Sequence, residues 1–308
     1  MDLAAHDVTA DDGTTLRLYE VGATGDGVGG PDGDEAVLCL HGGITSARAL
    51  FAPPVGEDGT SHSWLHAIAD HGRTAFALEV RGYGESDPLP EYDEPADAND
   101  PPVRAETAAR DIGAVVEWLS DSFDAVHLVG VSWGTHTTGK YVGVADPPVE
   151  SLALVAPVWK PAYAFDVALA ALDIPDYDRS WFEQSRETVR ARSGHDPEVF
   201  DAMWRAQVES GQGKDEDTYV VQAGGIADWA ASAEGDPVWD PADVDVPTLV
   251  FYGGDDEIAD RQGSIACYDE VGTDRKEYVE LAGVDHYMMH GERRREVFEL
   301  VDDFQNRV

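Results

Sequence analysis

Short runs rich in apolar residues recur along the chain and predict buried strands. A hairpin is expected within the first twenty residues, where Asp11, Asp12 and Gly13 form a turn signal and residues 14–19 alternate between apolar and polar. The later runs cover residues 36–40, 74–80, 125–131, 151–156, 246–252 and 276–281. Runs of this length, bounded by turn residues, are typical of strands in a buried sheet.

Segments with the helical spacing of apolar residues separate several of these runs. They cover residues 104–120, 133–144 and 291–304. Alternation of strand and helix is typical of a parallel sheet whose two faces are covered by helices. The predicted fold class is therefore α/β, with a mostly parallel central sheet flanked by helices. Residues 22–34, rich in Gly and Asp, are expected to form a loop.

The alternation stops between about residues 159 and 242, where many aromatic residues occur in mostly helical surroundings without strand-like runs. We therefore predict an α/β core made of residues 1–158 and 242–308, and an inserted helical cap made of residues 159–241. The aromatic side chains are expected to form the cap's own core rather than a cage around a substrate. A small subdomain needs such bulky residues to bury enough area.

The charge balance restricts the partners that the chain can have. The sequence contains 61 acidic and 21 basic residues, which gives a formal net charge of −40 at pH 7. This charge argues against nucleic acid or an anionic membrane as partner. It destabilises the compact state in dilute buffer, whereas salt at 1 M shortens the Debye length to about 3 Å. The composition resembles that of halophilic, salt-accumulating archaea; an ordinary acidic cytoplasmic protein is the alternative.

Signals for export, membrane insertion or disulfide formation are absent from the sequence pattern. The two cysteines, Cys39 and Cys267, predict neither a disulfide scaffold nor a metal site, and Cys39 lies within an apolar run. The N-terminus has no basic region before an apolar stretch, and no apolar run approaches the roughly 18 residues of a membrane span. We expect a soluble, cytoplasmic protein.

The strongest local motif is Gly-Val-Ser-Trp-Gly at residues 130–134, between the run 125–131 and a helical segment. A G-x-S-x-G in this place exposes the serine hydroxyl on a sharp turn, so Ser132 is the candidate nucleophile. A chance match in a glycine-rich chain is the alternative. The helix that follows directs its N-terminal amides toward the same place, which makes the Trp133 N–H a candidate donor to an oxyanion.

A second oxyanion donor is expected from the loop after the run 36–40. This loop begins with His41, Gly42 and Gly43, and Gly43 N–H is the candidate. His41 is expected to fix the loop by hydrogen bonding, with a role as general base as the alternative.

With these motifs, the sequence resembles the α/β-hydrolase superfamily over essentially its full length. Residues 77–86 (Ala-Leu-Glu-Val-Arg-Gly-Tyr-Gly-Glu-Ser) are similar to the D-x-R-G-x-G-x-S loop of the esterase, C–C hydrolase and proline iminopeptidase branches. Glu79 replaces the usual Asp, a departure expected to affect loop packing rather than catalysis. The resemblance implies the α/β-hydrolase fold with a helical cap and the chain order Ser, acid, His for a catalytic triad.

His286 is the candidate base, because a serine hydroxyl near neutral pH needs an imidazole within hydrogen-bond reach. It lies in the loop between the apparent last strand and the last helix, where similar hydrolases carry the catalytic His. His290 and His195 are the alternatives.

The candidate acid follows the strand at residues 248–252, in the turn Gly-Gly-Asp-Asp. The family pattern G-x-x-D maps the acid to Asp256, with Asp255 and Asp260 as alternatives. Some relatives place the acid after the strand that is here 151–156, but residues 157–159 offer no carboxylate.

The resemblance implies hydrolysis of a carboxylic ester with a small or medium acyl group, through an acyl-enzyme and without a metal or organic cofactor. A proline iminopeptidase-like aminopeptidase is the alternative, in which Glu183, Glu187 and Glu198 could hold a free amine. Ile44 and Thr45 depart from the H-G-G-P-G of that branch. Lactone or C–C bond hydrolysis, acyl transfer to an alcohol and binding without turnover also stay open.

Overall fold

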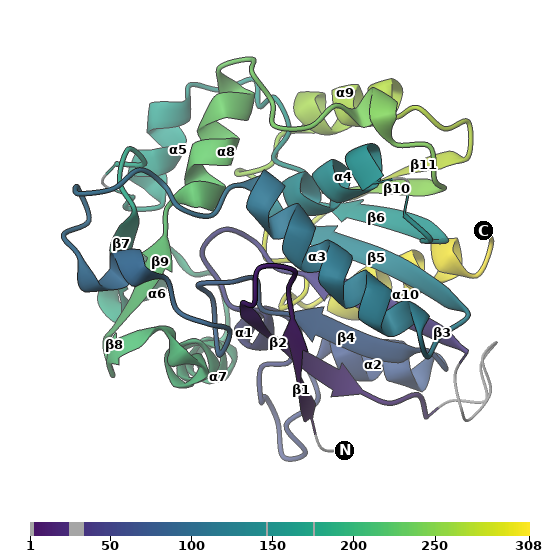
Figure 1. Ribbon diagram of the computed structural model, residues 1–308, viewed down its shortest axis with the longest axis horizontal. Coiled ribbons are helices and arrows are strands. Elements are labelled where there is room, and N and C mark those ends of the chain that lie inside the picture. Colours follow the sequence, from purple (N-terminus) through teal and green to yellow (C-terminus); the bar gives the residue numbers. More distant parts are fainter. Residues whose placement is uncertain (1–2, 25–33, 146, 175) are drawn as a thin grey trace.

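The computed structural model describes residues 3–24, 34–145, 147–174 and 176–308. An eight-stranded sheet in the order β1-β2-β4-β3-β5-β6-β10-β11 forms its centre (Figure 1). Its strands are β1 (Ala4–Thr9), β2 (Thr15–Val21), β3 (Glu35–Leu40), β4 (Thr74–Leu78), β5 (Ala125–Val131), β6 (Ser151–Val155), β10 (Thr248–Gly253) and β11 (Lys276–Leu281). β2 is antiparallel to both of its neighbours, and the other neighbouring strands are parallel. The predicted mostly parallel sheet is confirmed, while most of the expected loop, residues 25–33, lies outside the described residues.

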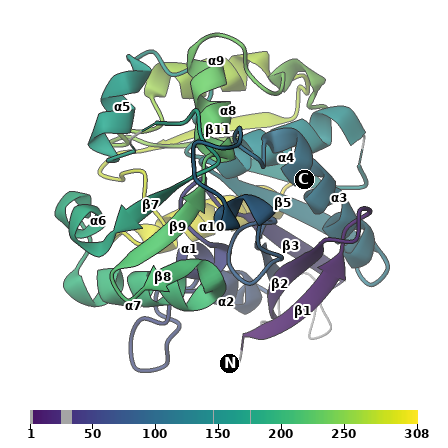
Figure 2. The same cartoon turned by 60° about the vertical axis from the view of Figure 1, so that its left-hand side comes forward.

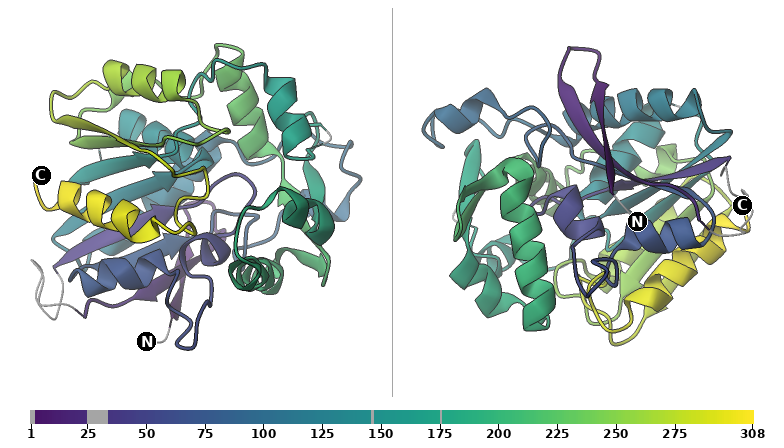
Figure 3. Two further views of the ribbon diagram at one scale, coloured as in Figure 1. Left: turned by 180° about the vertical axis from the view of Figure 1, so that it is seen from behind. Right: turned by 90° about the horizontal axis from the view of Figure 1, so that it is seen from below.

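Helices cover both faces of this sheet. The first face carries α1 (Ala47–Phe51), α2 (Trp64–Asp70) and α10 (Arg294–Gln305); the second carries α3 (Ala105–Ser120), α4 (Trp133–Ala145) and α9 (Arg261–Glu270) (Figures 1 and 3). Successive side chains of a strand point to opposite faces, so in β3 Val37 and Cys39 pack on the first face and Leu38 and Leu40 on the second. Burial on both faces explains why the central strands are continuous apolar runs.

Both cysteines are enclosed by these layers. Cys39 of β3 and Cys267 of α9 are fully buried, are not joined in a disulfide, and lie on opposite faces of the sheet. Burial raises the pKa of both thiols well above the ordinary value, because the interior disfavours the thiolate. Neither thiol is therefore available at the surface.

Residues 159–241, called the insertion below, connect β6 to β10 and lie beside the core sheet (Figure 1). Most of the regular secondary structure of the insertion is helical. Its helices are α5 (Phe165–Ala171), α6 (Arg186–Arg192), α7 (Pro197–Gln207) and α8 (Gly224–Ala233), with a short π-helical turn η3 (Val208–Gln212). Two short 3₁₀ turns are η2 (Pro90–Asp93), in the core, and η4 (Pro241–Asp243), where the insertion returns to the core. Within the described part of the chain, no helix is long and apolar enough to cross a membrane.

The insertion also contains a small antiparallel sheet, β7-β9-β8, made of Trp181–Ser185, Thr218–Gln222 and Gly213–Asp215 (Figure 2). The expectation that this region has no strands is therefore wrong. In β7 only Phe182 and Gln184 are buried, and one of them is polar. A strand covered on one side in this way does not produce a continuous apolar run.

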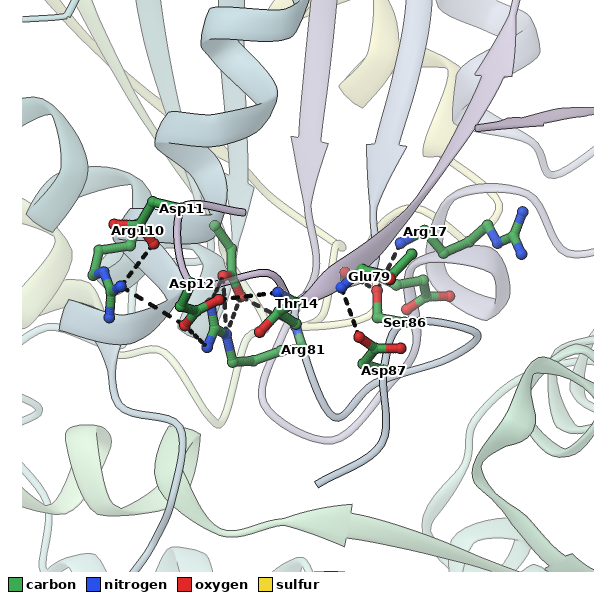
Figure 4. Close-up of polar contacts among 11 residues, drawn as sticks. Asp11, Asp12, Thr14, Arg17, Glu79, Arg81, Ser86, Asp87 and Arg110 are labelled. Carbon is green, nitrogen blue, oxygen red and sulfur yellow. Dashed lines mark hydrogen bonds and ion pairs between the residues drawn. The ribbon is translucent and has the colours of Figure 1, made fainter. Parts of the chain in front are cut away.

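Charged and polar side chains tie the loop after β4 to neighbouring elements (Figure 4). Arg81 forms ion pairs with Asp12 of the β1–β2 turn at 2.6 Å and with Asp111 of α3 at 2.5 Å. Ser86 donates its hydroxyl to the carbonyl oxygen of Glu79 at 2.6 Å. These contacts fix the loop whose sequence resembles the D-x-R-G-x-G-x-S pattern.

Glu79, the residue that departs from this pattern, caps the N-terminus of α1. Its side chain is fully buried and accepts hydrogen bonds from the amides of Ala47, at 2.8 Å, and Arg48, at 3.2 Å. Burial raises the pKa of Glu79 to about 7, although these two amide donors oppose the rise. The Glu79 carboxylate thus contacts the start of α1, and the expected effect of the Asp-to-Glu difference on loop packing stays a prediction.

Candidate active site

Ser132 lies on a sharp turn between β5 and α4. Its φ of +55° falls in the left-handed region, which residues with a side chain rarely adopt. A Cβ atom on Gly130 would lie 2.4 Å from the carbonyl oxygen of Gly134, and one on Gly134 would lie 2.3 Å from that of Leu40. The two glycines of the motif therefore permit the close approach of strand, turn and helix that this position requires.

His286 joins Ser132 to Asp256 by hydrogen bonds. Its Nε2 lies 3.0 Å from Ser132 Oγ, and its Nδ1 lies 2.9 Å and 3.1 Å from the two carboxylate oxygens of Asp256. The Asp256 carboxylate is buried and also accepts from the amides of Ile258 and Ala259, each at 2.8 Å. A carboxylate beside Nδ1 favours the proton on that nitrogen, which leaves Nε2 as an acceptor for the serine hydroxyl. The structure brings together the three residues named from the sequence.

The alternative acids have other positions. Asp255 is exposed, and Asp260 accepts from the amides of Gln262 and Gly263 at the start of α9. Within the described residues, neither carboxylate bonds to His286. Asp260 thus has a capping role that accounts for an acidic residue at this position.

The alternative bases are also separated from the serine hydroxyl. His290 is buried, with its Nε2 at 2.9 Å from the carbonyl oxygen of Leu50, and burial holds its pKa well below the ordinary value. His195 belongs to the insertion and packs edge-on against Tyr287, with the ring centroids 5.5 Å apart. Within the described residues, neither imidazole bonds to Ser132.

Gly43 and Trp133 line the same pocket as Ser132. In the described part of the chain, neither N–H donates to a protein acceptor. A Cβ atom on Gly42 would lie 3.3 Å from the Cβ of Ser132, so the loop after β3 packs against the candidate nucleophile. Both amides are therefore near the place where an oxyanion would form.

His41 fixes the direction of the Gly43 amide. Its Nε2 accepts from the amide of Val80 at 3.2 Å, so Nδ1 carries the proton and donates to the carbonyl oxygen of Gly42 at 2.8 Å. That carbonyl and the Gly43 N–H belong to one planar peptide unit. Burial lowers the pKa of His41 to about 4, which keeps the ring neutral at neutral pH. This is the loop-fixing contact that the sequence analysis expects.

Two adjoining pockets surround these groups, and Ile44, Thr45 and Tyr287 belong to the walls of both. The remaining wall of the first pocket consists of Gly42, Gly43, Leu50, Val131, Ser132, Trp133, Val158, Leu172, Gly225, Ile226, Trp229, Ile258, His286 and Met289. The remaining wall of the second consists of Ala49, Val189, Arg192, Ser193, His195, Phe200, Met203, Trp204, Gln207 and Tyr219. No Asp or Glu is among these described wall residues. In the described ranges, no group of three or more His, Cys, Asp or Glu is placed to hold a metal ion.

The aromatic residues of the insertion both pack its interior and line the pockets. Phe165 packs edge-on against Trp229, with ring centroids 4.9 Å apart, and Phe200 stacks on Trp204 at 6.1 Å. Trp229 also belongs to the first pocket, and Phe200 and Trp204 belong to the second. The expected internal packing is present, and three of these rings also contribute to a pocket wall, because one face of a ring can pack while the other faces a pocket.

The three carboxylates considered as a site for a free amine lie away from the pockets. Glu183 forms an ion pair with Lys214 at 2.5 Å, and Glu183, Glu187 and Glu198 are all exposed. None of the three lines either pocket.

Asp228 of α8 ties the insertion to the turn at the nucleophile. It is fully buried and accepts from the indole N–H of Trp133 at 2.8 Å and from the amide of Ala105 at 2.7 Å, and it forms an ion pair with Arg104. A Cβ atom on Gly225 of the same helix would lie 3.0 Å from the Trp133 ring. Sequence reasoning missed Asp228, because nothing in the pattern separates it from the other acidic residues.

Comparison with known proteins shows the family of this chain. The profile of the alpha/beta hydrolase fold family matches residues 35–292. The chain belongs to the α/β-hydrolase family. No curated protein matches the sequence of this hydrolase.

Solved structures of the same fold extend over nearly the whole hydrolase. An E-2-(acetamidomethylene)succinate hydrolase has 22% identity and a TM-score of 0.66, over 99% of this chain and 100% of that chain. An esterase from Exiguobacterium antarcticum has 16% identity and a TM-score of 0.67, over 98% and 100%. A meta-cleavage product hydrolase from Pseudomonas fluorescens has 14% identity and a TM-score of 0.68, over 98% and 97%. At these identities the likeness shows the fold alone.

Proposed function

We propose that this α/β-hydrolase cleaves carboxylic esters, with Ser132 as nucleophile, His286 as general base and Asp256 as the acid that orients the imidazole. The observation that carries the proposal is the continuous set of hydrogen bonds from Asp256 through His286 to Ser132, at a mostly apolar pocket. An apolar pocket with a few placed polar groups suits a small or medium acyl chain.

Acylation uses all of the polar groups described at the first pocket. Ser132 Oγ attacks the ester carbonyl carbon while His286 Nε2 takes the hydroxyl proton. The carbonyl oxygen becomes an oxyanion, to which the amides of Gly43 and Trp133 donate. The imidazolium then returns its proton to the leaving alcohol as the ester C–O bond breaks. Asp256 stabilises the imidazolium without taking its proton.

Deacylation repeats the sequence with water in place of the alcohol. His286 Nε2 takes a proton from water as its oxygen attacks the acyl carbon, and the second oxyanion uses the same two amides. The proton passes to Ser132 Oγ as the acyl–oxygen bond breaks. The products are a carboxylic acid and the free enzyme, so the reaction needs no further co-reactant.

The absence of acidic residues from the described walls favours an ester over a peptide with a free N-terminus. A protonated amine taken from water into an apolar pocket needs a paired carboxylate. The cap glutamates that could serve are exposed, and neither pocket supplies a substitute. This observation supports the esterase proposal against the aminopeptidase alternative.

The test compares the wild type with Ser132→Ala on p-nitrophenyl acetate and butyrate in concentrated KCl, with proline p-nitroanilide in parallel. Removal of the nucleophile is expected to lower kcat for ester hydrolysis by at least about a thousandfold. Ser264→Ala is the matched control, since Ser264 is a buried serine outside both pockets. A fluorophosphonate should add one covalent adduct to the wild type and none to Ser132→Ala.

Cleavage of the anilide alone would contradict the esterase proposal and favour the aminopeptidase alternative. Ester activity that persists in Ser132→Ala would remove Ser132 as nucleophile. A γ-lactone and a vinylogous β-diketone complete the substrate panel, and turnover restricted to one of them would redirect the proposal to lactone or C–C bond hydrolysis.

A further inference from the structure

The second pocket lies directly beside the first and provides room for a part of the substrate beyond the scissile bond. The two pockets share Ile44, Thr45 and Tyr287, and Tyr287 directly follows the candidate base. Its walls are largely apolar, with Phe200 and Trp204 of α7 among them. A ligand attached to Ser132 in the first pocket can therefore extend past Tyr287 into the second.

One wall residue of the second pocket carries a positive charge without a matching carboxylate. Arg192, at the end of α6, donates to the carbonyl oxygen of Leu172 and to the side-chain oxygen of Gln184, which are both neutral acceptors. Within the described residues, Arg192 forms no ion pair, and its Nε–H has no acceptor. A partly buried guanidinium held only by neutral groups retains most of its attraction for an anion.

The lack of local negative charge is unusual in this molecule. Acidic residues outnumber basic ones by 61 to 21 over the whole sequence, yet none is found among the described residues that line either pocket. The second pocket thus combines the charge of Arg192 with low-polarity walls, in which an attraction between opposite charges is screened less than in water.

Two phenol groups lie near the same guanidinium. Burial raises the pKa of both Tyr219 and Tyr287, and the charge of Arg192 opposes the rise in each case. Both tyrosines belong to the pocket wall, and a protonated phenol is a hydrogen-bond donor. The wall of the second pocket therefore contains a guanidinium and two residues with a hydroxyl donor.

We propose that the second pocket binds a carboxylate of the substrate through Arg192, so that the preferred ester carries an acid group separated from the scissile carbonyl by a short apolar chain. This inference rests on the proposed esterase function and names its substrate class. A planar carboxylate fits the planar guanidinium and can also accept from Tyr219 and Tyr287. His195, on the same wall, has its pKa lowered by burial and adds no fixed charge.

The experiment uses the mono-p-nitrophenyl esters of succinate, glutarate and adipate, each beside its methyl-capped neutral counterpart of equal acyl length. The measured quantity is the ratio of kcat/KM for the anionic ester to that for the neutral ester, at one salt concentration. For the wild type, we expect a ratio of about ten or more at one of the three lengths, as for a charged hydrogen-bonded contact.

Arg192→Gln should lower that ratio by about tenfold or more, and Arg192→Lys should retain part of it, because it keeps the charge but loses the planar fork. Arg190→Gln is the matched control. Arg190 lies on the same helix, donates to the carbonyl oxygen of His195 and is outside both pocket walls. It should leave the ratio unchanged.

Active-site titration with the fluorophosphonate counts folded sites, so a variant that folds poorly still gives an interpretable ratio. Inhibition by free glutarate provides a second measurement, and it should be weaker in Arg192→Gln. A wild-type ratio of one or less at every length, or equal ratios in wild type and Arg192→Gln, would overturn the inference. In those cases the neutral esters would still be cleaved through Ser132; loss of all Ser132-dependent ester cleavage would instead overturn the proposed function.

Discussion

Residues of the core and residues of the insertion meet at both pockets, but the elements that carry them differ in size and burial. Ser132, Asp256 and His286 follow β5, β10 and β11, so the parallel sheet brings them to one edge. The second pocket is lined mainly by α6, α7 and β9, and α6 has no buried residue. Ser132 and Asp256 thus follow strands that are almost entirely buried, and His286 follows the partly exposed edge strand β11, while the part expected to select substrates rests on small elements. Substitutions in the insertion can therefore change substrate selectivity without changing the catalytic residues of the core.

Among the described helices of the insertion, α8 is the most completely buried. Most of its residues are buried, and it packs beside Trp133 rather than above the second pocket. In its burial and packing, α8 is similar to the helices of the core, although it lies between β6 and β10 in the sequence. The extent of packing therefore differs between individual elements more clearly than it differs between the core and the insertion.

Asp256→Asn should give the largest effect in the core. Asn cannot stabilise the imidazolium and favours the wrong tautomer of His286, so kcat for ester hydrolysis should fall by roughly a thousandfold to ten-thousandfold. The measurement is steady-state hydrolysis of p-nitrophenyl butyrate. Asp255→Asn is the matched control because that neighbouring side chain is exposed. Similar losses in both variants would remove Asp256 from the proposed triad.

Asp228→Ala tests whether the buried contacts of α8 contribute to stability as those of a core helix do. The change leaves two buried donors, the indole N–H of Trp133 and the amide of Ala105, without an acceptor. The free energy of unfolding should fall by roughly 4 kcal/mol, at about 1 to 3 kcal/mol for each donor. Urea denaturation in fixed salt measures this value, and the exposed Asp236→Ala serves as control. If Asp228→Ala lowers the free energy of unfolding no more than the control does, α8 belongs with the lightly packed elements.

Glu79→Gln gives the smallest of the three effects, a change in the free energy of unfolding that depends on pH. The pKa of Glu79 is raised from 4.5 to about 7 in the folded protein, so the folded state holds a proton that the unfolded chain releases. The wild type should therefore lose stability relative to Glu79→Gln as pH rises from about 4.5 to 7, by on the order of 3 kcal/mol. Unfolding midpoints across this range measure the difference. Glu57→Gln, in an exposed loop, should show no such trend, and a flat difference for Glu79→Gln would contradict the shift.

The fold of the core and the triad candidates could be predicted because local sequence fixes them strongly. β3 and β5 are buried on both faces, which forces continuous apolar runs, and the turn at Ser132 demands glycine at fixed positions. The loops after β10 and β11 then place Asp256 and His286 near Ser132. The roles of these residues and of the Gly43 and Trp133 amides stay predictions until the variants are measured.

The rest depended on tertiary contacts that leave no local pattern. β7 alternates between buried and exposed positions and contains a buried Gln184, so its residues resemble a loop or helix surface. Asp228 acquires its contacts only when α8 packs on the start of α4. Arg192 becomes notable only because the folded walls around it contain no carboxylate.

The burial of Cys39 and Cys267 makes this hydrolase suitable for site-directed labelling without prior removal of its native cysteines. Maleimides and nitroxide reagents react with accessible thiolates, and both native thiols are covered and kept protonated. Cysteines introduced at Val167 of α5 and Trp118 of α3, which are both exposed, should accept a pair of spin labels selectively. The distance distribution between these labels would then report whether the insertion moves against the core when a dicarboxylate is added.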